Sequence, residues 1–546
     1  MRSTRLHVTI LAALTLAALA LRFWRLGAMP LFGDEAYYLL WADRLAPAYF
    51  DHPAGIAFLL KLSTLLGGRS ELGVRWLNAL LSTACVPLAY AVGRRYVSGS
   101  GGLIAAAAVA FGPVYVITGR VAYPDTLQAF LLLVNLLALA PLLEEHGTSW
   151  RWGWFGLTLA LFLNVKLSSG FYGIALVVYV LGWRRDLLRQ PGLWLAAGLA
   201  ALGLIPAADW NLAHDWGMVR WAIYQGRGFD LPQPGRRASL AHAWRYLTPP
   251  AGVLAGLTAA TFLAAFTARI LKTGWRLPGR SRRATGYPQG PVLLPLVAAC
   301  LILPVVLSAA NSPRNLGLGL LALWPLAGLA FPVRLETPAH EDTGSLPAYP
   351  PPRIRRFVDT CTCTALRRKC RCSPIRLFVF LPPCLLLAVY GLGTAAALSA
   401  PTRLPHNIAA PAIRSDAAGW PEFARAFSPP ATSLPLVVDY SIAGQIAHYC
   451  GCPIYSSAEQ FRLWGIPDFS DLTVLSLTFI PPELITARLR GDFDRVSGPE
   501  TWRYEGAEVD KSVYIWQAQG RRVSPSQVLD DLDYLRLAQQ AAIPLH

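Results

Sequence analysis

Long uninterrupted runs of apolar residues dominate the chain up to about residue 400. The runs at 6–21, 292–309 and 377–398 approach or reach the roughly 20 residues that a helix needs to cross a bilayer. The full pattern predicts spans near 8–22, 72–92, 102–118, 126–143, 152–165, 170–183, 192–208, 250–268, 292–309, 315–332 and 377–398. It therefore predicts a polytopic α-helical membrane protein with about eleven transmembrane helices.

After residue 400 the pattern changes to polar and apolar alternation, interrupted by Pro and Gly. This alternation is typical of a small domain outside the bilayer. The expected strands are 434–440, 472–480 and 512–516, and the expected helices are 442–449 and 527–541. We therefore predict a transmembrane domain over 1–399 and a small C-terminal α/β domain over 400–546.

The composition supports a membrane protein and excludes three other classes. Hydrophobic residues make up 54% of the 546 positions and charged residues only 15%. A soluble fold of this length needs more charge to cover its surface. Soluble enzymes, fibrous proteins and disordered regulators are therefore excluded.

The net charge of +17 is unevenly distributed, and its distribution argues against nucleic-acid binding. The tail from residue 400 holds 12 of the 49 basic and 16 of the 32 acidic residues, so it is acidic by 4 charges and the rest is basic by 21. The densest basic cluster, 353–371, lies between two predicted spans. The tendency of basic loops to stay in the cytoplasm explains this charge without nucleic acid.

The same rule decides how the apolar segment 152–183 crosses the membrane. If it forms two short spans around Lys166, then Arg184, Arg185 and Arg189 fall on the same side as Arg94 and Arg95. Two short spans in this segment therefore predict a cytoplasmic N-terminus and an outer C-terminus. Three outer pieces are then large: 23–71, 209–249 and the tail.

The first outer loop holds the most unusual chemistry, because its acids are surrounded by Trp, Tyr, Phe and Leu. Asp34 and Glu35 are adjacent, and Asp51 and His52 follow before Pro53. An ordinary solvated loop also contains acids, which then have no function. Carboxylates held at an apolar surface, however, are candidate general bases. Amphipathic segments at 37–45 and 55–65 are expected to lie along the membrane surface.

The second outer turn contains Arg120 and then Pro124-Asp125 at the start of a predicted span. Taken alone, Asp125 is explained by helix capping, since Pro and an acid both suit a first turn. Lys166, between two short spans, is likewise explained by a side chain that reaches from a span end toward water.

Together these positions resemble the lipid-linked-sugar glycosyltransferases of the GT-C fold. The resemblance is strongest to bacterial relatives of the protein O-mannosyltransferases and to the aminoarabinose and galacturonic-acid transferases that modify lipid A. It covers about residues 20–230, and the tail fits more loosely through Gly419-Trp420 and Val438-Asp439-Tyr440. The matching motifs are Gly33-Asp34-Glu35-Ala36-Tyr37-Tyr38, Tyr49-Phe50-Asp51-His52-Pro53, Val74-Arg75-Trp76-Leu77-Asn78, Arg120 with Pro124-Asp125, Asn164-Val165-Lys166-Leu167-Ser168-Ser169-Gly170, and Asp209-Trp210-Asn211-Leu212-Ala213-His214-Asp215-Trp216.

The resemblance implies transfer of a sugar from a polyprenyl phosphate to a hydroxyl of a lipid, glycan or protein, at the outer face of a bacterial plasma membrane. Such a reaction needs a base for the acceptor and cations for the phosphate. Asp34 matches the first-loop carboxylate, the usual candidate base, and Asp125 matches the second-loop carboxylate. Candidates for the phosphate, or for pairing the two acids, are Arg75, Arg120 and Lys166. The other expected substrate-binding residues are Glu35, Asp51 and His52.

This chain departs from the family pattern in one place. Where lipid A transferases often carry an acid–lysine pair before the proline, it has Asp51-His52. That difference argues against inferring aminoarabinose specificity from the resemblance. It also leaves two roles open for His52, a phosphate contact or a metal ligand. We expect no required cofactor, and the alternative is a divalent ion held by Asp34, Asp51, His52 and Asp125.

Two groups of cysteines have no assigned role in this scheme. Cys361, Cys363, Cys370 and Cys372 are expected in a cytoplasmic loop, where thiols stay reduced, and their spacing is not the usual one for zinc. Cys450 and Cys452 are expected outside, where a disulfide across one residue is strained, and its formation is left open.

Two other classes of function compete with the transferase. A transporter or flippase for lipid-linked glycans has charges near the bilayer midplane and often internal repeats, whereas here the distinctive acids lie in outer loops and no repeat is visible. A non-catalytic assembly factor tolerates amidation of its acids.

The topology is directly testable with reporter fusions. A reporter joined after His546 should be active only outside the cytoplasm, because the basic loops fix the opposite side as cytoplasmic. A C-terminal fusion that is active only in the cytoplasm would contradict this topology.

Overall fold

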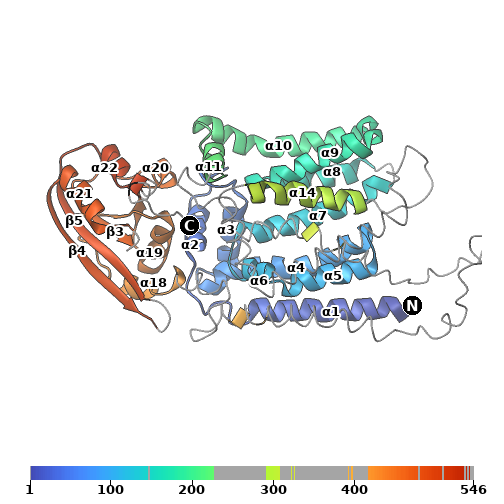
Figure 1. Cartoon of the computed structure of the whole chain (residues 1–546), viewed down its shortest axis with the longest axis horizontal. Helices are drawn as coiled ribbons and strands as arrows, with labels where there is room; N and C mark the ends of the chain where they lie inside the picture. Colours follow the sequence, from blue (N-terminus) through green and yellow to red (C-terminus); the bar gives the residue numbers. More distant parts are fainter. Residues whose placement is uncertain are drawn as a thin grey trace, which may run out of the picture.

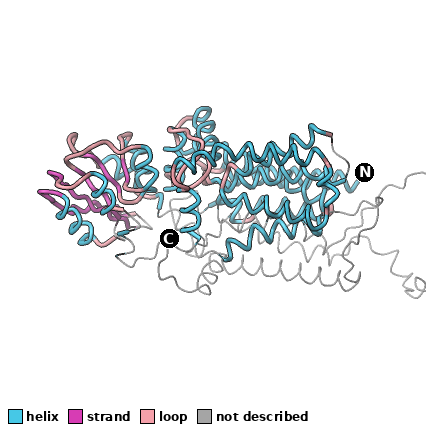
Figure 2. Tube along the Cα trace, turned by 90° about the horizontal axis from the view of Figure 1, so that it is seen from above, coloured by secondary structure: helices cyan, strands magenta, loops and turns pink. Residues whose placement is uncertain are grey.

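The computed structural model describes residues 2–144, 148–226, 290–307, 416–477, 480–506 and 510–533, with a few isolated residues besides. Figure 1 shows a bundle of roughly parallel helices with a mixed α/β part at one end and the N-terminus at the other. Among the described residues, the strands are confined to that α/β part, as the view from above also shows (Figure 2).

The bundle is built from helices that follow the predicted apolar runs. They are α1 (Arg2–Phe23), α4 (Glu71–Tyr96), α5 (Gly99–Phe111), α6 (Pro113–Arg120), α7 (Pro124–Glu144), α8 (Ser149–Leu163), α9 (Gly170–Trp183), α10 (Pro191–Ala213), α11 (Gly217–Gly226) and α14 (Gly290–Leu307). Within the described residues, four helices are long and apolar enough to cross a membrane: α1, α4, α7 and α10. A helical membrane protein is confirmed at this level, while the total of eleven spans stays a prediction.

The span expected at 102–118 is found as a bent pair of helices. It consists of α5 and α6, which bend by 53° at a break between them. Gly112 has an extended backbone there, and Pro113 begins the second helix. Proline lacks the amide hydrogen and disfavours a helical conformation in the residue before it, so the helix stops at this point.

The segment 152–183 forms the predicted pair of short helices. α8 ends at Leu163, and a 3-10 turn over Leu167–Ser169 separates it from α9. The predicted spans 250–268, 315–332 and 377–398 lie wholly or almost wholly outside the described residues. The basic cluster 353–371 and its four cysteines lie outside them as well.

Two buried arginines hold the bent pair against α1. Arg22, near the end of α1, donates to the carbonyl oxygens of Val109 (2.7 Å) and Ala110 (3.1 Å) at the end of α5. Arg120, at the end of α6, donates in return to the carbonyl oxygen of Leu21 (2.7 Å). The last carbonyls of a helix have no partner within it, so each arginine supplies donors that the bilayer does not.

The α/β part contains a five-stranded sheet in the order β2-β1-β3-β5-β4 within the described residues. Its strands are β1 (Leu434–Val437), β2 (Tyr455–Ser456), β3 (Leu472–Leu477), β4 (Phe493–Glu505) and β5 (Asp510–Arg521). β1 pairs in parallel with β2 and β3, whereas β5 is antiparallel to β3 and β4. Its helices are α18 (Trp420–Ala426), α19 (Tyr440–Cys450), α20 (Glu459–Trp464), α21 (Pro482–Asp492) and α22 (Pro525–Asp531).

The three predicted strands and both predicted helices are found at their places. The helix expected at 527–541 begins as α22, which ends at Asp531, and several later residues of that range lie outside the described residues. Strand β4 was not predicted, since most of its side chains are exposed and Gly498-Pro499 interrupts its pattern. The predicted boundary at residue 400 lies outside the described residues.

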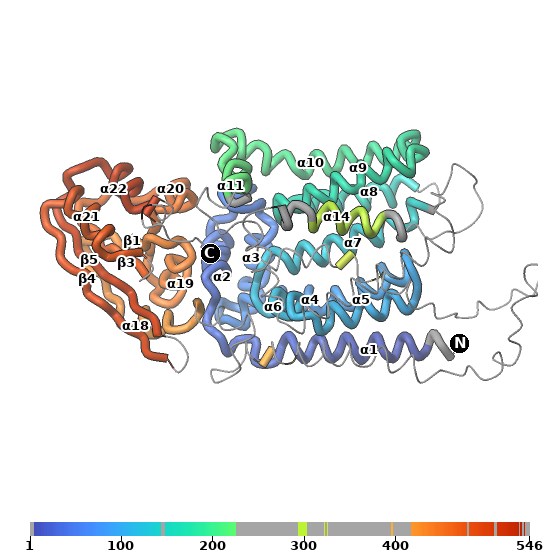
Figure 3. The backbone as a smooth tube through the Cα atoms, viewed as in Figure 1, coloured from blue at the N-terminus to red at the C-terminus, as the bar shows by residue number. Residues whose placement is uncertain are grey.

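The first predicted outer loop folds into two helices, α2 (Gly33–Asp43) and α3 (Gly55–Gly67), at the end of the bundle next to the α/β part (Figure 3). α19 packs directly on α2. A Cβ atom at Gly444 would lie only 2.6 Å from the backbone nitrogen of Tyr37, so the two backbones touch. The loop and the tail therefore share one end of the molecule, as predicted, and the N-terminus lies at the other (Figure 1).

Candidate active site

Asp34 lies in the first turn of α2, where the bundle meets the α/β part. The helix begins at Gly33, whose amide donates to Oδ2 of Asp416 (2.8 Å). The Asp34 side chain is half-buried. A negative side chain in the first turn is favoured by the helix dipole, which helps to keep a carboxylate in this position.

Three other carboxylates act electrostatically with Asp34. They are Asp51 from the first loop and Asp416 and Asp439 from the α/β part. Burial raises the pKa of Asp51 to about 6, the negative charge of Asp34 adds to this, and a hydrogen bond from Tyr37 opposes it. Burial raises the pKa of Asp439 in the same way, against hydrogen bonds from Ser441.

Asp416 links this group of acids to the sheet. Burial raises its pKa to about 6, while the Gly33 amide and the charge of Lys511 pull in the other direction. Its backbone oxygen accepts from Nζ of Lys511 (3.0 Å), on strand β5. Four acids thus meet where the first turns of α2 and α19 approach each other, a concentration that a solvated loop does not produce.

Two tyrosines line the same group of acids. The Tyr37 hydroxyl donates to Oδ2 of Asp51 (2.7 Å), and its ring centroid lies 4.7 Å from that of Tyr440. Burial, and then the neighbouring carboxylates, raise the pKa of both phenols well above the usual value. Both phenols therefore remain neutral, and Tyr37 is a hydrogen-bond donor to Asp51.

Glu35 and Arg75, two predicted substrate contacts, bind each other instead. Their closest atoms are 2.6 Å apart, with side-chain exposures of 0% and 1%. Glu35 also accepts from the amides of Phe32 (2.9 Å) and Ala122 (2.7 Å). Arg75 was expected to bind the phosphate or to pair with Asp34 and Asp125, and its partner in the structure is Glu35. Its guanidinium is enclosed and donates its other hydrogen bonds to backbone oxygens of residues 26–30.

The second predicted acid, Asp125, is paired with the predicted cation Lys166. Nζ of Lys166 lies 3.3 Å from Oδ1 of Asp125, and their side chains are 13% and 11% exposed. Lys166 thus has the acid-pairing role expected as one alternative. The turn before Asp125 is joined to the start of α2, because Ala122 bonds Glu35 and the rings of Tyr123 and Phe32 lie 5.7 Å apart. The turn before Asp125 is therefore in contact with the start of the helix that carries Asp34.

The remaining predicted residues occupy different surroundings. Arg120 is buried and caps α1, as described above, so its bonds in the structure go to the fold. The His52 ring is half-buried and lies 6.1 Å from the ring of Tyr38. Within the described part of the chain, no group of three or more His, Cys, Asp or Glu side chains could hold a metal ion.

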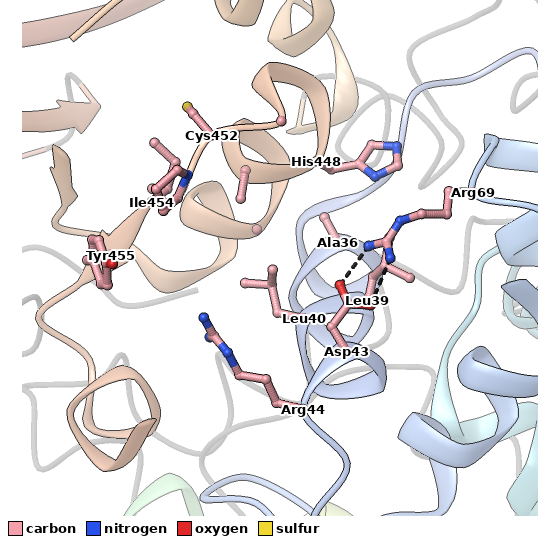
Figure 4. Close-up of a pocket in the computed structure, with 14 residues that line it drawn as sticks. Ala36, Leu39, Leu40, Asp43, Arg44, Arg69, His448, Cys452, Ile454 and Tyr455 are labelled. Carbon is pink, nitrogen blue, oxygen red and sulfur yellow. Dashed lines mark hydrogen bonds and ion pairs between the residues drawn. The ribbon is translucent and has the colours of Figure 1, made fainter. Parts of the chain in front are cut away.

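A cavity of about 350 Å³ lies between α2 and α19 (Figure 4). At helical spacing, positions 36, 39, 40 and 43 face the cavity, and positions 34, 37, 38 and 41 face the other way. Its polar lining comes from Asp43, Arg44, Arg69, His448 and Tyr455. The cavity is thus separate from the four acids.

The cysteine pair near this cavity is bonded. Cys450 and Cys452 form a disulfide at the end of α19, and Cys452 is part of the cavity wall. The question that the spacing left open is thereby answered for the described structure.

The sequence reasoning missed Asp416 and Lys511. Both lie in the tail, far from the first loop in sequence, and each stands in a motif with no distinctive spacing. Asp439 was noticed only as part of a loosely fitting motif. Asp439 is the N-cap residue of α19, and its carboxylate accepts from the amide of Ser441 (2.8 Å). An Asp directly before a predicted helix was the sequence signal for this position.

Comparison with known proteins gives one family match and one similar curated sequence. Residues 51–210 match the family described as dolichyl-phosphate-mannose-protein mannosyltransferase. The lipid A galacturonosyltransferase RgtD of Rhizobium johnstonii is 27% identical over 224 residues. That alignment spans 38% of this chain and 44% of the relative, less than half of either.

Solved structures of similar fold include ArnT from Cupriavidus metallidurans. Its apo form has a TM-score of 0.55 at 15% identity, over 94% of this chain and 98% of that one. Its form bound to undecaprenyl phosphate has a TM-score of 0.56 at 14% identity, over 93% and 97%. At this identity the likeness establishes a shared fold. Together with the family match, it confirms the resemblance to lipid-linked-sugar glycosyltransferases of the GT-C fold.

The buried Glu35–Arg75 pair predicts a large loss of stability when one partner is removed. Arg75→Met should lower the free energy of unfolding by about 3–5 kcal/mol, because it leaves a buried carboxylate without its cation. Thermal unfolding in detergent measures this. Arg69→Met is the control, since its partner Asp43 is exposed and such pairs contribute about 1 kcal/mol or less. Equal effects of the two substitutions would contradict the burial of Glu35.

The raised pKa of Asp51 predicts a pH-dependent difference between the protein and Asp51→Asn. The folded value of about 6 exceeds the ordinary 3.8, so ionised Asp51 destabilises the fold, and this cost develops as pH rises through about 4–6. The variant should therefore gain melting temperature relative to the unchanged protein between about pH 5 and about pH 7.5. A difference that stays constant over this range would place the pKa of Asp51 elsewhere.

Proposed function

We propose that this chain is an integral-membrane glycosyltransferase that moves a sugar from a polyprenyl-phosphate donor to an acceptor hydroxyl, on the outer face of a bacterial plasma membrane. The observation that carries the proposal is Asp34, which lies among other acids in the first turn of α2, in a fold shared with ArnT. The acceptor is a hydroxyl of a lipid, glycan or protein, and the similarity to a lipid A galacturonosyltransferase favours a lipid.

The donor class follows from the fold comparison and from the position of the acids. One ArnT structure is bound to undecaprenyl phosphate. Asp34 lies in the first turn of α2, which is bonded to the α/β part, and Asp125 follows the turn that is bonded to the same helix. Nucleotide sugars are absent on the outer side of a bacterial membrane. A lipid carrier that delivers the sugar from within the bilayer is therefore the matching donor.

The reaction we propose is a single displacement with inversion at the anomeric carbon. The acceptor oxygen forms a bond to that carbon as Asp34 takes the hydroxyl proton, and the carbon–oxygen bond to the phosphate breaks. The electrons of that bond leave with the polyprenyl phosphate, so no other reactant is required. Asp34 has this role, rather than that of a nucleophile, because the family resemblance points to one base per loop and not to a close catalytic pair.

Lys166 is the cation proposed to hold the departing phosphate. In the structure it is paired with Asp125, which fixes the position of its ammonium group. A charge-assisted contact with the phosphate would stabilise the negative charge that develops on the leaving oxygen. Asp125 is then the residue that orients Lys166, and Arg75 and Arg120 support the surrounding helices.

Two other functions make different predictions for the same acids. A flippase for lipid-linked glycans moves its substrate without breaking the anomeric bond, and an assembly factor has no substrate of this kind. Both would leave sugar transfer at background in membranes that contain the unchanged protein.

The central test compares sugar transfer by the unchanged protein and by Asp34→Asn. The amide keeps the size of the side chain but is not basic, so turnover should fall by roughly 10²–10⁴-fold while donor binding survives. The measurement is transfer of labelled sugar from a polyprenyl phosphate to membrane lipids, glycans and proteins, separated and identified by mass spectrometry.

The matched control is Asp43→Asn, at the other end of the same helix, where the carboxylate pairs with exposed Arg69. It should retain normal turnover. Normal turnover of Asp34→Asn together with loss in Asp125→Asn would assign the base to Asp125. Activity with a nucleotide sugar and none with the lipid-linked donor would refute the proposed donor class.

A further inference from the structure

The first turn of α2 is held in place by the α/β part and not only by the bundle. Gly33 is the first residue of the helix, and its amide has no partner within it. Oδ2 of Asp416 accepts from that amide at 2.8 Å. The helix that carries Asp34 is therefore capped by a carboxylate that is nearly 400 positions away in the sequence.

Asp416 is itself fixed from strand β5. Nζ of Lys511 donates to the backbone oxygens of Asp416 (3.0 Å) and Ala418 (2.7 Å). The same ammonium lies 4.2 Å from the ring centroid of Trp420, which is fully buried. The turn that carries Asp416 is thus attached to the sheet by a cation with two carbonyl partners and an aromatic face.

A buried glutamine of α19 ties the same turn to the segment before α2. Nε2 of Gln445 donates to the backbone oxygens of Leu31 (2.9 Å) and Asp416 (3.2 Å). Next to it, the hydroxyl of Tyr449 accepts from the amide of Leu31 (2.7 Å). The chain just before Gly33 is therefore also held by the α/β part.

Close packing leaves this contact little room to adjust. A Cβ atom at Gly33 would lie 2.9 Å from Cβ of Ser441 and 3.2 Å from Oδ2 of Asp416. With the contact of Gly444 against Tyr37, the two helices touch at two backbone positions. Because this contact is closely packed, a shift of the sheet would also shift the start of α2.

We propose that Asp416 is a positioning residue of the active site, which holds Asp34 in its catalytic position through the Gly33 amide. The α/β part is then a component of the catalytic unit and not an appended domain. This inference rests on the proposed function, in which Asp34 is the base. Displacement of a reacting group by about 1 Å costs on the order of 10²-fold in rate, so loss of this one bond has a measurable effect.

The first experiment measures kcat and KM for the lipid-linked donor in Asp416→Ala. We expect kcat to fall by about 10²-fold with little change in KM, because the base moves and the donor contacts do not. Asp416→Asn keeps an acceptor oxygen for the Gly33 amide and should recover most of that loss. Asp494→Ala, an exposed acid of the same α/β part that pairs with Arg522, is the control and should retain normal kcat.

A double substitution separates positioning from general loss of folded protein. If Asp416 acts through Asp34, Asp416→Ala should lower the residual activity of Asp34→Asn by less than about threefold, since the base is already gone. An additional loss of about 10²-fold in that background would overturn the proposal, because it would show that Asp416 acts independently of Asp34.

The second experiment needs no sugar donor. Hydrogen–deuterium exchange of a peptide covering residues 31–38 should be at least about tenfold faster in Asp416→Ala, because the first turn of α2 loses its cap. Unchanged exchange in this peptide would overturn the inference whatever the enzyme activity. Normal exchange and normal kcat in Asp416→Ala, with an inactive Asp34→Asn, would refute the positioning role and leave the proposed function intact. Faster exchange in a protein without transferase activity would refute the proposed function and leave the structural link.

Discussion

The buried carboxylate of Glu35 is the interaction on which the arrangement of this site depends. It accepts from Arg75 of α4, from the amide of Phe32 before α2, and from the amide of Ala122 before α7. A buried charge is tolerated only when it is paired and fully hydrogen-bonded, so these three elements must meet at one point. Asp34 is adjacent to Glu35, and Asp125 follows Ala122 by three residues. One ion pair therefore brings together the two loops that carry the proposed chemistry.

The second constraint comes from the tail of the chain. The bundle holds α2 through the buried side chain of Glu35. The α/β part holds the first turn of α2 through Asp416, and α19 packs against the helix. Asp34 lies where these two supports meet. The neighbouring acids Asp51, Asp416 and Asp439 concentrate negative charge there, and the neutral hydroxyl of Tyr37 donates to Asp51. The cavity with Arg44 and Arg69 lies on the other face of α2 and is a separate feature.

Local patterns were sufficient to predict much of the fold. Apolar runs located α1, α4, α7 and α10, and the positive-inside rule predicted that 152–183 divides into two helices. The bend at Gly112-Pro113 was not predicted, because the apolar run continues through it, although a proline is the sequence signal for the end of a helix. Strand β4 could not be predicted, because an exposed edge with a Gly-Pro interruption has no alternation to detect.

The partners of the site residues were less predictable than their positions. A charge in an apolar loop has the same sequence pattern whether it binds substrate or another side chain, so Arg75 and Glu35 both looked like substrate contacts. The Asp416–Gly33 bond joins residues whose relation depends on tertiary packing alone. The most direct test of this account is an experimental structure with a polyprenyl phosphate bound. We predict the phosphate on the Asp34 face of α2, in contact with Lys166. A phosphate bound to Arg44 and Arg69 in the cavity on the opposite face would contradict the account.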